Sequence, residues 1–195
     1  MAKIAIVYHS GFGHTKVIAE RIARGTTFHP GIQATLLTAE SLTAGDAGAT
    51  GTGWDELHIA DCIVFGCPTY MGSVSAELKR VFERTGKVWG RQLWRDKLAA
   101  GFTNAAATSG DKLNAIQDIF HFAMQHGMIW VSQGVMMTGA TEHDVNRMGS
   151  YAGMMAQSRD DSPEVTPPEG DRRTAELFGK RLAEVTLRFA RGKDA

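Results

Sequence analysis

The sequence has little cysteine and no excess of charge of either sign. Cysteine occurs at Cys62 and Cys67, and their odd separation in one apolar run places them on opposite faces of a strand, so neither a disulfide nor a metal site is expected. Lysine plus arginine and aspartate plus glutamate each number 21, which gives a formal net charge of zero. Nucleic-acid binding normally goes with a basic excess. These absences favour a cytoplasmic protein that does not bind nucleic acid.

Long hydrophobic runs are also missing. No apolar stretch approaches the roughly 18 residues of a membrane-spanning helix, and the N-terminal "IAIV" is shorter than the apolar core of a signal peptide. Hydrophobic residues make up 43% and charged residues 22%, fractions typical of globular proteins. A length of 195 residues suits one domain of ordinary size, so we expect a single domain over residues 1–195 and no membrane span.

Five apolar segments predict β-strands. Each is a continuous run rather than an alternation, as in parallel strands that are covered on both faces. Helical patterns follow the first, third, fourth and fifth of them, and we expect Gly25 to cap the first helix and Gly86 to end the second. The predicted strands are residues 3–8, 32–38, 62–68, 97–104 and 128–134, and the predicted helices are residues 14–25, 73–86, 109–127 and 171–192.

Alternating strands and helices predict an α/β fold with a doubly wound, five-stranded parallel sheet. The strand order that we expect is 2-1-3-4-5, which is the flavodoxin-like arrangement. Two segments have no clear periodicity and are predicted to be irregular, namely residues 39–56 and 135–170. A long irregular stretch within a compact domain is commonly functional or mobile.

The stretch "HSGFGHT" (residues 9–15) joins the first predicted strand to the first helix. In a doubly wound sheet such a loop lies where ligands bind, and the free N–H groups of the following helix point at it. Two glycines let the backbone approach an anion, and two hydroxyls add donors. The loop is not a Walker A motif, and Lys16 stands where a dinucleotide fingerprint needs its third glycine. It therefore predicts a cradle for one phosphate monoester, formed by Ser10, Gly11, Phe12, Gly13, His14 and Thr15.

Two further loops are predicted at the same edge of the sheet. One follows the third strand and offers an aromatic and a thioether side chain, and the other follows the fourth strand and is made of small and hydroxylated residues. Together with the cradle they describe a site for a flat heteroaromatic cofactor with a phosphate tail. The residues concerned are Pro68, Thr69, Tyr70, Met71 and Gly72 in the first loop, and Thr103, Asn104, Ala105, Ala106 and Ser109 in the second.

These loops resemble the FMN site of the flavodoxin-like superfamily, and their motifs are most similar to the WrbA-type NAD(P)H:quinone oxidoreductases. The similarity runs over most of the chain. It consists of Ser-x-x-Gly-His at 10–14, Gly-x-Pro-Thr-x-x-Gly at 66–72, Thr-Gly-x-x-Trp at 85–89, His-Gly-Met at 126–128 and Tyr-x-Gly at 151–153. The chain departs from the family at Gln125, where a histidine is frequent, and at Tyr70 and Met71, where arginine and phenylalanine are common.

The resemblance implies an FMN enzyme that passes two electrons from NAD(P)H to a quinone by a ping-pong mechanism. It also implies a homo-oligomer, a dimer or a tetramer, whose active sites are completed by a neighbouring subunit. The flavin would carry the chemistry, so no catalytic side chain is expected, and Trp89 becomes the candidate wall for the substrate. Trp89 has a simpler interpretation as a packing partner of Trp94, and His126 as a capping or interface residue.

Other functions are compatible with the same loops. A flavodoxin-type electron carrier would hold FMN in the same way, although such carriers are typically acidic and this chain is neutral. An NAD(P)H-dependent FMN reductase would use the flavin as a substrate. A non-enzymatic interaction module is disfavoured by the intact cradle. The methionines of residues 135–155 suit a subunit interface, an adaptable substrate wall or a plain loop.

Overall fold

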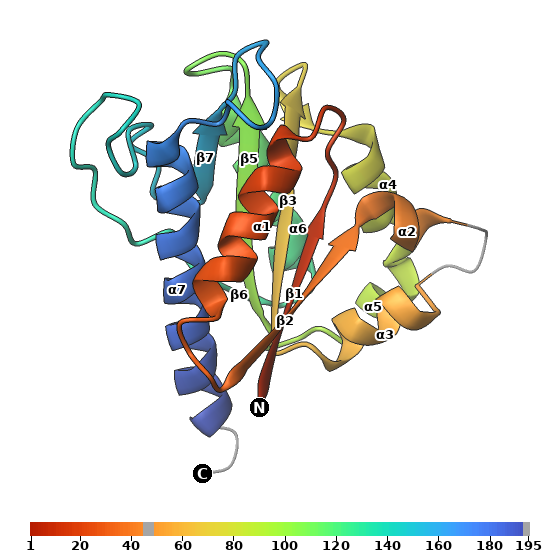
Figure 1. Ribbon diagram of the computed structural model, residues 1–195. Helices are drawn as coiled ribbons and strands as arrows, with labels where there is room; N and C mark the ends of the chain where they lie inside the picture. The colour runs from red at the N-terminus through yellow and green to blue at the C-terminus, as the bar shows by residue number, and fades with distance from the viewer. Residues whose placement is uncertain (45–48, 193–195) are drawn as a thin grey trace.

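The computed structural model describes residues 1–44 and 49–192, in which strands and helices alternate along most of the chain (Figure 1). The strands are β1 (Ala2–Tyr8), β2 (Ile32–Thr38), β3 (Cys62–Tyr70), β4 (Ser73–Val74), β5 (Leu98–Ala105), β6 (Ile129–Trp130) and β7 (Met154–Gln157). The helices are α1 (His14–Thr26), α2 (Ala39–Thr43), α3 (Thr52–Ile59), α4 (Ala76–Arg84), α5 (Gly86–Gly90), α6 (Lys112–Gln125) and α7 (Glu169–Arg191). Within the described ranges, no helix has both the length and the apolar character that crossing a membrane requires.

The sheet confirms the predicted fold class. Its main path runs β2-β1-β3-β5-β6, and neighbouring strands along this path are parallel. This is the order expected for the five strands predicted from the sequence. Over residues 1–44 and 49–192 the sheet has seven strands rather than five, because β4 pairs antiparallel with the end of β3 and β7 pairs parallel with β5.

The fifth predicted strand, residues 128–134, is largely wrong. Only Ile129 and Trp130 pair with β5, beside Leu98 and Ala99. The chain then leaves the sheet, and β7 takes the place beside the carboxyl half of β5, from the pair Phe102–Met154 to the pair Ala105–Gln157. The apolar run at 128–134 predicts a strand of ordinary length, but the sheet divides that position between two short segments.

The prediction of an irregular segment at 39–56 is also wrong over most of its described part. Helix α2 begins after Thr38, whose side-chain oxygen accepts a hydrogen bond from the Ser41 N–H at 3.2 Å. Helix α3 is tied to it by the indole N–H of Trp54, which donates to the Leu42 carbonyl at 3.0 Å. Residues 45–48 of the predicted segment lie outside the described residues.

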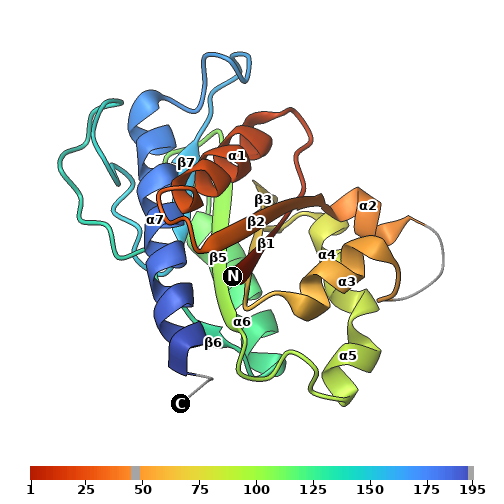
Figure 2. The same ribbon diagram turned by 60° about the horizontal axis from the view of Figure 1, so that its bottom comes forward.

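Two hydrophobic cores cover the two faces of the sheet, and Figure 2 shows α1 and α7 together on one side with α3, α4 and α5 on the other. Cys62 packs in the core beneath α1 and α7, whereas Cys67 packs in the opposite core. The two thiols therefore lie on opposite faces, as the odd spacing predicts. Burial raises the pKa of both thiols to about 12, so both stay protonated at neutral pH.

Helices α1 and α7 pack closely because each has a glycine at their contact. A Cβ atom on Gly25 would overlap the Glu176 carbonyl, and one on Gly179 would overlap the Ile22 carbonyl. The prediction that Gly25 caps α1 is thus wrong, because the helix continues through it to Thr26. Gly86 does not end α4 either, since α4 ends at Arg84 and Gly86 is the first residue of α5.

We predict that Gly179→Ala lowers the free energy of unfolding by about 3 kcal/mol, because the added methyl group forces the two helices apart. Gly90→Ala is the matched control, since no atom lies within 4 Å of a Cβ built at this helical glycine. The control should be neutral or slightly stabilising. Urea unfolding of both variants measures the effect, and equal stabilities would contradict the close packing of α1 on α7.

Candidate functional site

A cavity of about 550 Å³ opens at the carboxyl ends of the parallel strands, where the loops at the top of Figure 1 converge. Ligands of doubly wound proteins bind at this edge. Three of its walls are loops that the sequence predicts, and the fourth is not predicted. The lining residues are Ser10, Gly11, Phe12, His14, Thr15, Pro68, Thr69, Tyr70, Asn104, Ala105, Ala106, Ser158, Arg159, Asp160, Asp161, Ser162 and Pro163.

The first wall is the turn between β1 and α1. Gly13 has a φ of 93°, which sets the start of the helix so that the Val17 N–H donates to its carbonyl at 3.1 Å. The Ser10 hydroxyl oxygen accepts from the Lys16 N–H at 3.1 Å. Within the described part of the chain, the N–H groups of residues 11–15 have no acceptor. A run of free N–H groups at a helix N-terminus suits an anion.

The second wall is the end of β3 and the tight turn into β4. Pro68, Thr69 and Tyr70 line the cavity, and Met71 and Gly72 form the turn with φ angles of 48° and 79°. Tyr70 is partly exposed and Met71 fully so. The ring of Tyr70 stands edge-on to the ring of His9, 6.5 Å between centroids. This wall therefore offers apolar and aromatic surface.

The third wall is the end of β5 and the loop after it. Asn104, Ala105 and Ala106 line the cavity. Thr103 lies just behind them, where its hydroxyl donates to the Cys67 carbonyl at 2.7 Å and accepts from the Thr69 hydroxyl at 2.7 Å. This pair of hydroxyls fixes β3 to β5 directly beneath the site.

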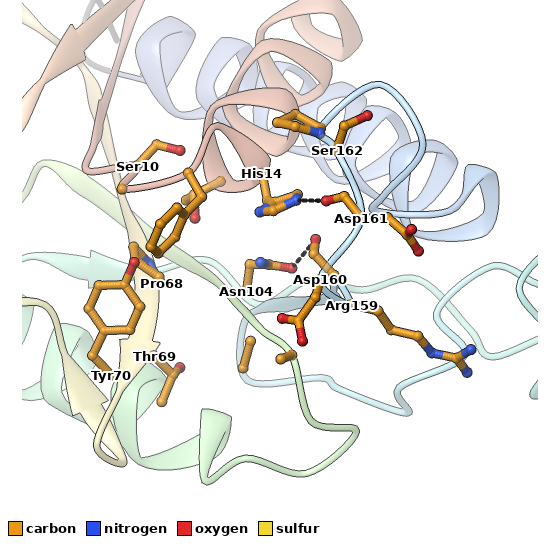
Figure 3. A pocket seen from close by; sticks show the side chains of 17 residues that line it. Ser10, His14, Pro68, Thr69, Tyr70, Asn104, Arg159, Asp160, Asp161 and Ser162 are labelled. Atoms are coloured by element: carbon orange, nitrogen blue, oxygen red, sulfur yellow. Dashed lines mark hydrogen bonds between the residues drawn. The ribbon is translucent and has the colours of Figure 1, made fainter.

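The fourth wall, residues 158–163, was missed by the sequence analysis. It follows β7, so it reaches the same edge of the sheet as the other loops. Figure 3 shows its contacts: the His14 ring nitrogen Nε2 donates to the Asp161 carbonyl at 2.8 Å, and the Ser158 hydroxyl donates to the Asn104 side chain at 3.0 Å. The available signal was the polar run after "MMAQ", a short strand without any β-branched residue.

Five predicted site residues do not line the cavity, although all of them lie on its predicted loops. Gly13 faces Pro163, since a Cβ atom on it would come within 2.6 Å of that ring. Met71 and Gly72 shape the turn, Thr103 lies behind the wall, and Ser109 belongs to the exposed part of the third loop. Eleven of the sixteen predicted cofactor residues are thus brought together at one cavity, and these five stand around it.

Trp89 lies in a different place. It is 50% exposed and lines a separate hollow of about 310 Å³, which has no lining residue in common with the first cavity. Helix α5, which carries it, lies at the lower right of Figure 1, away from the converging loops. Gln125 and His126 line the same hollow. The structure of one chain does not bring Trp89 to the predicted cofactor site.

His126 is a neutral, buried residue of this second hollow. The Thr85 hydroxyl donates to the Phe82 carbonyl at 2.6 Å, so its oxygen accepts from His126 Nε2 at 2.9 Å. Burial lowers the pKa of His126 to about 4, and among the residues that the structure describes Nδ1 has no hydrogen-bond partner. The ring packs 4.9 Å from that of Trp94 and 4.8 Å from that of Phe122. His126 is thus placed as a packing residue.

The sheet order, the anion cradle and the apolar-walled cavity define a flavodoxin-like flavoprotein of the WrbA type. The sequence model of the NADPH-dependent FMN reductase family matches residues 28–142, and the chain belongs to this family. The resemblance found in the sequence motifs is therefore confirmed.

Three relatives match nearly the whole chain. "Flavodoxin FldP" of Pseudomonas aeruginosa is 36% identical over 188 residues, which cover 95% of this chain and 97% of that protein. "NAD(P)H dehydrogenase (quinone)" of Solidesulfovibrio magneticus is 29% identical over 200 residues, 95% of this chain and 98% of that protein. The crystal structure of a WrbA-like flavodoxin from Agrobacterium tumefaciens is 37% identical, has a TM-score of 0.74 and covers 97% of this chain and 99% of that one.

Proposed function

We propose that the protein is an FMN-dependent oxidoreductase that transfers electrons from NAD(P)H to quinones. The observation that carries this proposal is the run of free N–H groups at residues 11–15, which opens onto a cavity with aromatic and small-residue walls. Such a site fits a phosphate tail followed by a flat ring. Relatives that span almost the full chain are named NAD(P)H dehydrogenase (quinone), which supports the donor and the acceptor.

The residues present fit FMN. The N–H groups of the cradle and the hydroxyls of Ser10 and Thr15 would hold the phosphate. Tyr70 would flank the ring on one side and the chain at Ala105 and Ala106 on the other. The full set that we propose for cofactor binding is Ser10, Gly11, Phe12, Gly13, His14, Thr15, Pro68, Thr69, Tyr70, Met71, Gly72, Thr103, Asn104, Ala105, Ala106 and Ser109.

FMN, when bound, supplies the two-electron chemistry between the nicotinamide and the quinone. The chain's own contribution is to bind, to orient and to keep the walls of the cavity fixed. His14 donates a hydrogen bond to the Asp161 carbonyl and thus connects the cradle to the fourth wall. The nicotinamide and the quinone bind in turn at the opening, which gives ping-pong kinetics, and solvent supplies the protons.

The assembly and location belong to the same proposal. Trp89 is remote from the cavity of its own chain, so it can meet a substrate only at the site of a neighbouring subunit. A substrate role for Trp89 therefore requires a homo-oligomer, and on the family resemblance we favour the homotetramer over the dimer. Residues 1–195 act as one domain in the cytoplasm, where the two buried thiols remain reduced.

The first test is an anaerobic titration of the FMN-reconstituted protein with NADH and with NADPH, followed by benzoquinone. We expect fast bleaching of the flavin absorbance by at least one nucleotide and fast recovery on adding the quinone. Steady-state rates should give the parallel lines of ping-pong kinetics. FMN that binds but is reduced by neither nucleotide would indicate a flavodoxin-type carrier, the function that the name of the P. aeruginosa relative suggests. FMN that leaves after each reduction would indicate an FMN reductase.

We predict that Ser10→Ala together with Thr15→Ala weakens FMN binding by about 3 kcal/mol or more, because each hydroxyl bond to a charged group contributes about 1.5–3 kcal/mol. Fluorescence quenching of FMN measures the dissociation constant. Ser41→Ala is the control, since its hydroxyl donates to the Thr38 carbonyl outside the cavity. Thermal unfolding checks the fold, because Ser10 also accepts from Lys16. An unchanged dissociation constant would show that this loop does not bind the phosphate of FMN.

We predict that Trp89→Ala raises the Michaelis constant for the quinone several-fold and leaves FMN affinity unchanged, because the indole meets the substrate rather than the cofactor. Light scattering on the same sample gives the subunit number. Leu93→Ala is the control, as Leu93 is exposed and lines neither hollow. A monomeric protein with unaltered quinone kinetics would leave Trp89 as a packing partner only.

A further inference from the structure

Lys112 is the first residue of α6 and is only 1% exposed, which is unusual for lysine. A buried ammonium group is unfavourable unless it has partners. Its Nζ donates to the Ala107 carbonyl at 2.9 Å and lies 3.6 Å from the Met148 sulfur. Ala107 belongs to the loop after β5, next to two residues that line the cavity. Lys112 thus lies directly behind the third wall of the proposed cofactor site.

The charged groups that act on Lys112 come from α7 and from the segment between β6 and β7. Asp171 of α7 accepts hydrogen bonds from Arg147 Nε at 2.8 Å and Nη2 at 3.0 Å, and the side chains are 2% and 7% exposed. Together with Lys112 they form a buried cluster with a net charge of +1. The negative charge of Asp171 stabilises the charged form of Lys112, and the positive charge of Arg147 destabilises it.

A second side chain holds the same loop. Gln157, the last residue of β7, donates through Nε2 to the Ala106 carbonyl at 2.9 Å. Its own backbone N–H donates to Asp171 at 2.8 Å, and its side-chain oxygen accepts from Arg147 at 3.2 Å. The carbonyls of Ala106 and Ala107 are therefore both held by buried side chains, the first by Gln157 and the second by Lys112.

Holding these two carbonyls fixes the direction of two N–H groups. In a trans peptide the C=O and the following N–H point in opposite directions. Because the Ala106 and Ala107 carbonyls point into the protein, the N–H groups of Ala107 and Thr108 point out of it. In the described part of the chain neither N–H has an acceptor. The loop thus presents two free donors directly after Ala105 and Ala106, which line the cavity.

We propose that Lys112 is a positioning residue for the cofactor: its ammonium group holds the Ala107 carbonyl so that the N–H groups of Ala107 and Thr108 face bound FMN. The identity of the ligand rests on the proposed function, whereas the anchoring of the loop does not. The affinity for FMN then depends on the charge of Lys112, because a charge-assisted hydrogen bond is about twice as strong as a neutral one.

The charge of Lys112 changes within an accessible pH range. Burial lowers the pKa of Lys112 to about 8, Arg147 adds to the effect and Asp171 opposes it. The ammonium group is present at pH 7 and is largely lost at pH 9. The anchor weakens over this interval, so the dissociation constant of FMN should rise as the pH rises.

The experiment measures FMN binding to the full-length apo-protein by fluorescence quenching at pH 7, 8 and 9, for the wild type and Lys112→Met. We expect the wild-type dissociation constant to rise about threefold to tenfold between pH 7 and pH 9. Lys112→Met should bind about tenfold more weakly at pH 7 and show little pH dependence. Lys97→Met is the matched control, because Lys97 also donates to carbonyls, but to those of His58 and Ala60, neither of which belongs to the loop after β5.

A second measurement needs no flavin. Elastase cleaves after small residues, so its rate of cutting at Ala105–Ala107 in the apo-protein reports how firmly the loop is held. We expect faster cutting in Lys112→Met than in Lys97→Met, and faster cutting of the wild type at pH 9 than at pH 7 after correction with a peptide substrate. This pH comparison stands even if Lys112→Met does not fold.

The two readouts separate the two proposals. If the wild type binds no FMN, the proposed function fails, and with it the cofactor part of this inference. If the wild type binds FMN but neither the affinity nor the cutting rate responds to pH or to Lys112→Met, the role of Lys112 is wrong and the proposed function stands. If Lys97→Met abolishes the pH dependence as well, the effect belongs to general stability, and the inference is overturned.

Discussion

The carboxylate of Asp171 is the interaction on which the walls of the cavity depend. It accepts hydrogen bonds from two nitrogens of Arg147 and from the backbone of Gln157, and so joins the start of α7, the segment between β6 and β7, and β7 itself. A buried carboxylate is stable only with such complete pairing. Through Gln157 the same group reaches the loop after β5, and β7 leads directly into the fourth wall. Two of the four walls, the third and the fourth, are thus connected to one buried carboxylate.

The second constraint is topological. Parallel strands end at a common edge of the sheet. The topology alone therefore brings together the loops after β1, β3, β5 and β7. The last sheet position is divided between β6 and β7, and β7 is the segment that reaches this edge, so the fourth wall comes from the loop after β7. His14 then connects the first loop to the fourth across the opening, and the cavity becomes a closed ring of contacts.

How much could be predicted depends on whether the signal is local. The cradle at residues 10–15 is predicted from glycine and hydroxyl chemistry next to a helix, and five of these six residues line the cavity. Gly25 shows the opposite case. A glycine near the end of a helix can cap that helix or can let a second helix pack closely against it, and the sequence does not distinguish the two roles. In the sequence Lys112 looks like an ordinary helix-surface lysine, because its burial depends on residues distant in the chain such as Met148. Trp89 is predicted from a motif, and motif spacing carries no information on its distance from the cavity of the folded chain.

The cradle has one further property. Neither lysine nor arginine occurs among residues 10–15, so an anion held there meets N–H groups and hydroxyls rather than full positive charges. Attraction between full charges at a surface weakens when dissolved ions screen it, whereas short hydrogen bonds within a partly enclosed turn are screened far less. The proposed phosphate would be held on this turn by the direction and length of its hydrogen bonds, and its residence time should differ little between dilute buffer and the ionic strength of a cell.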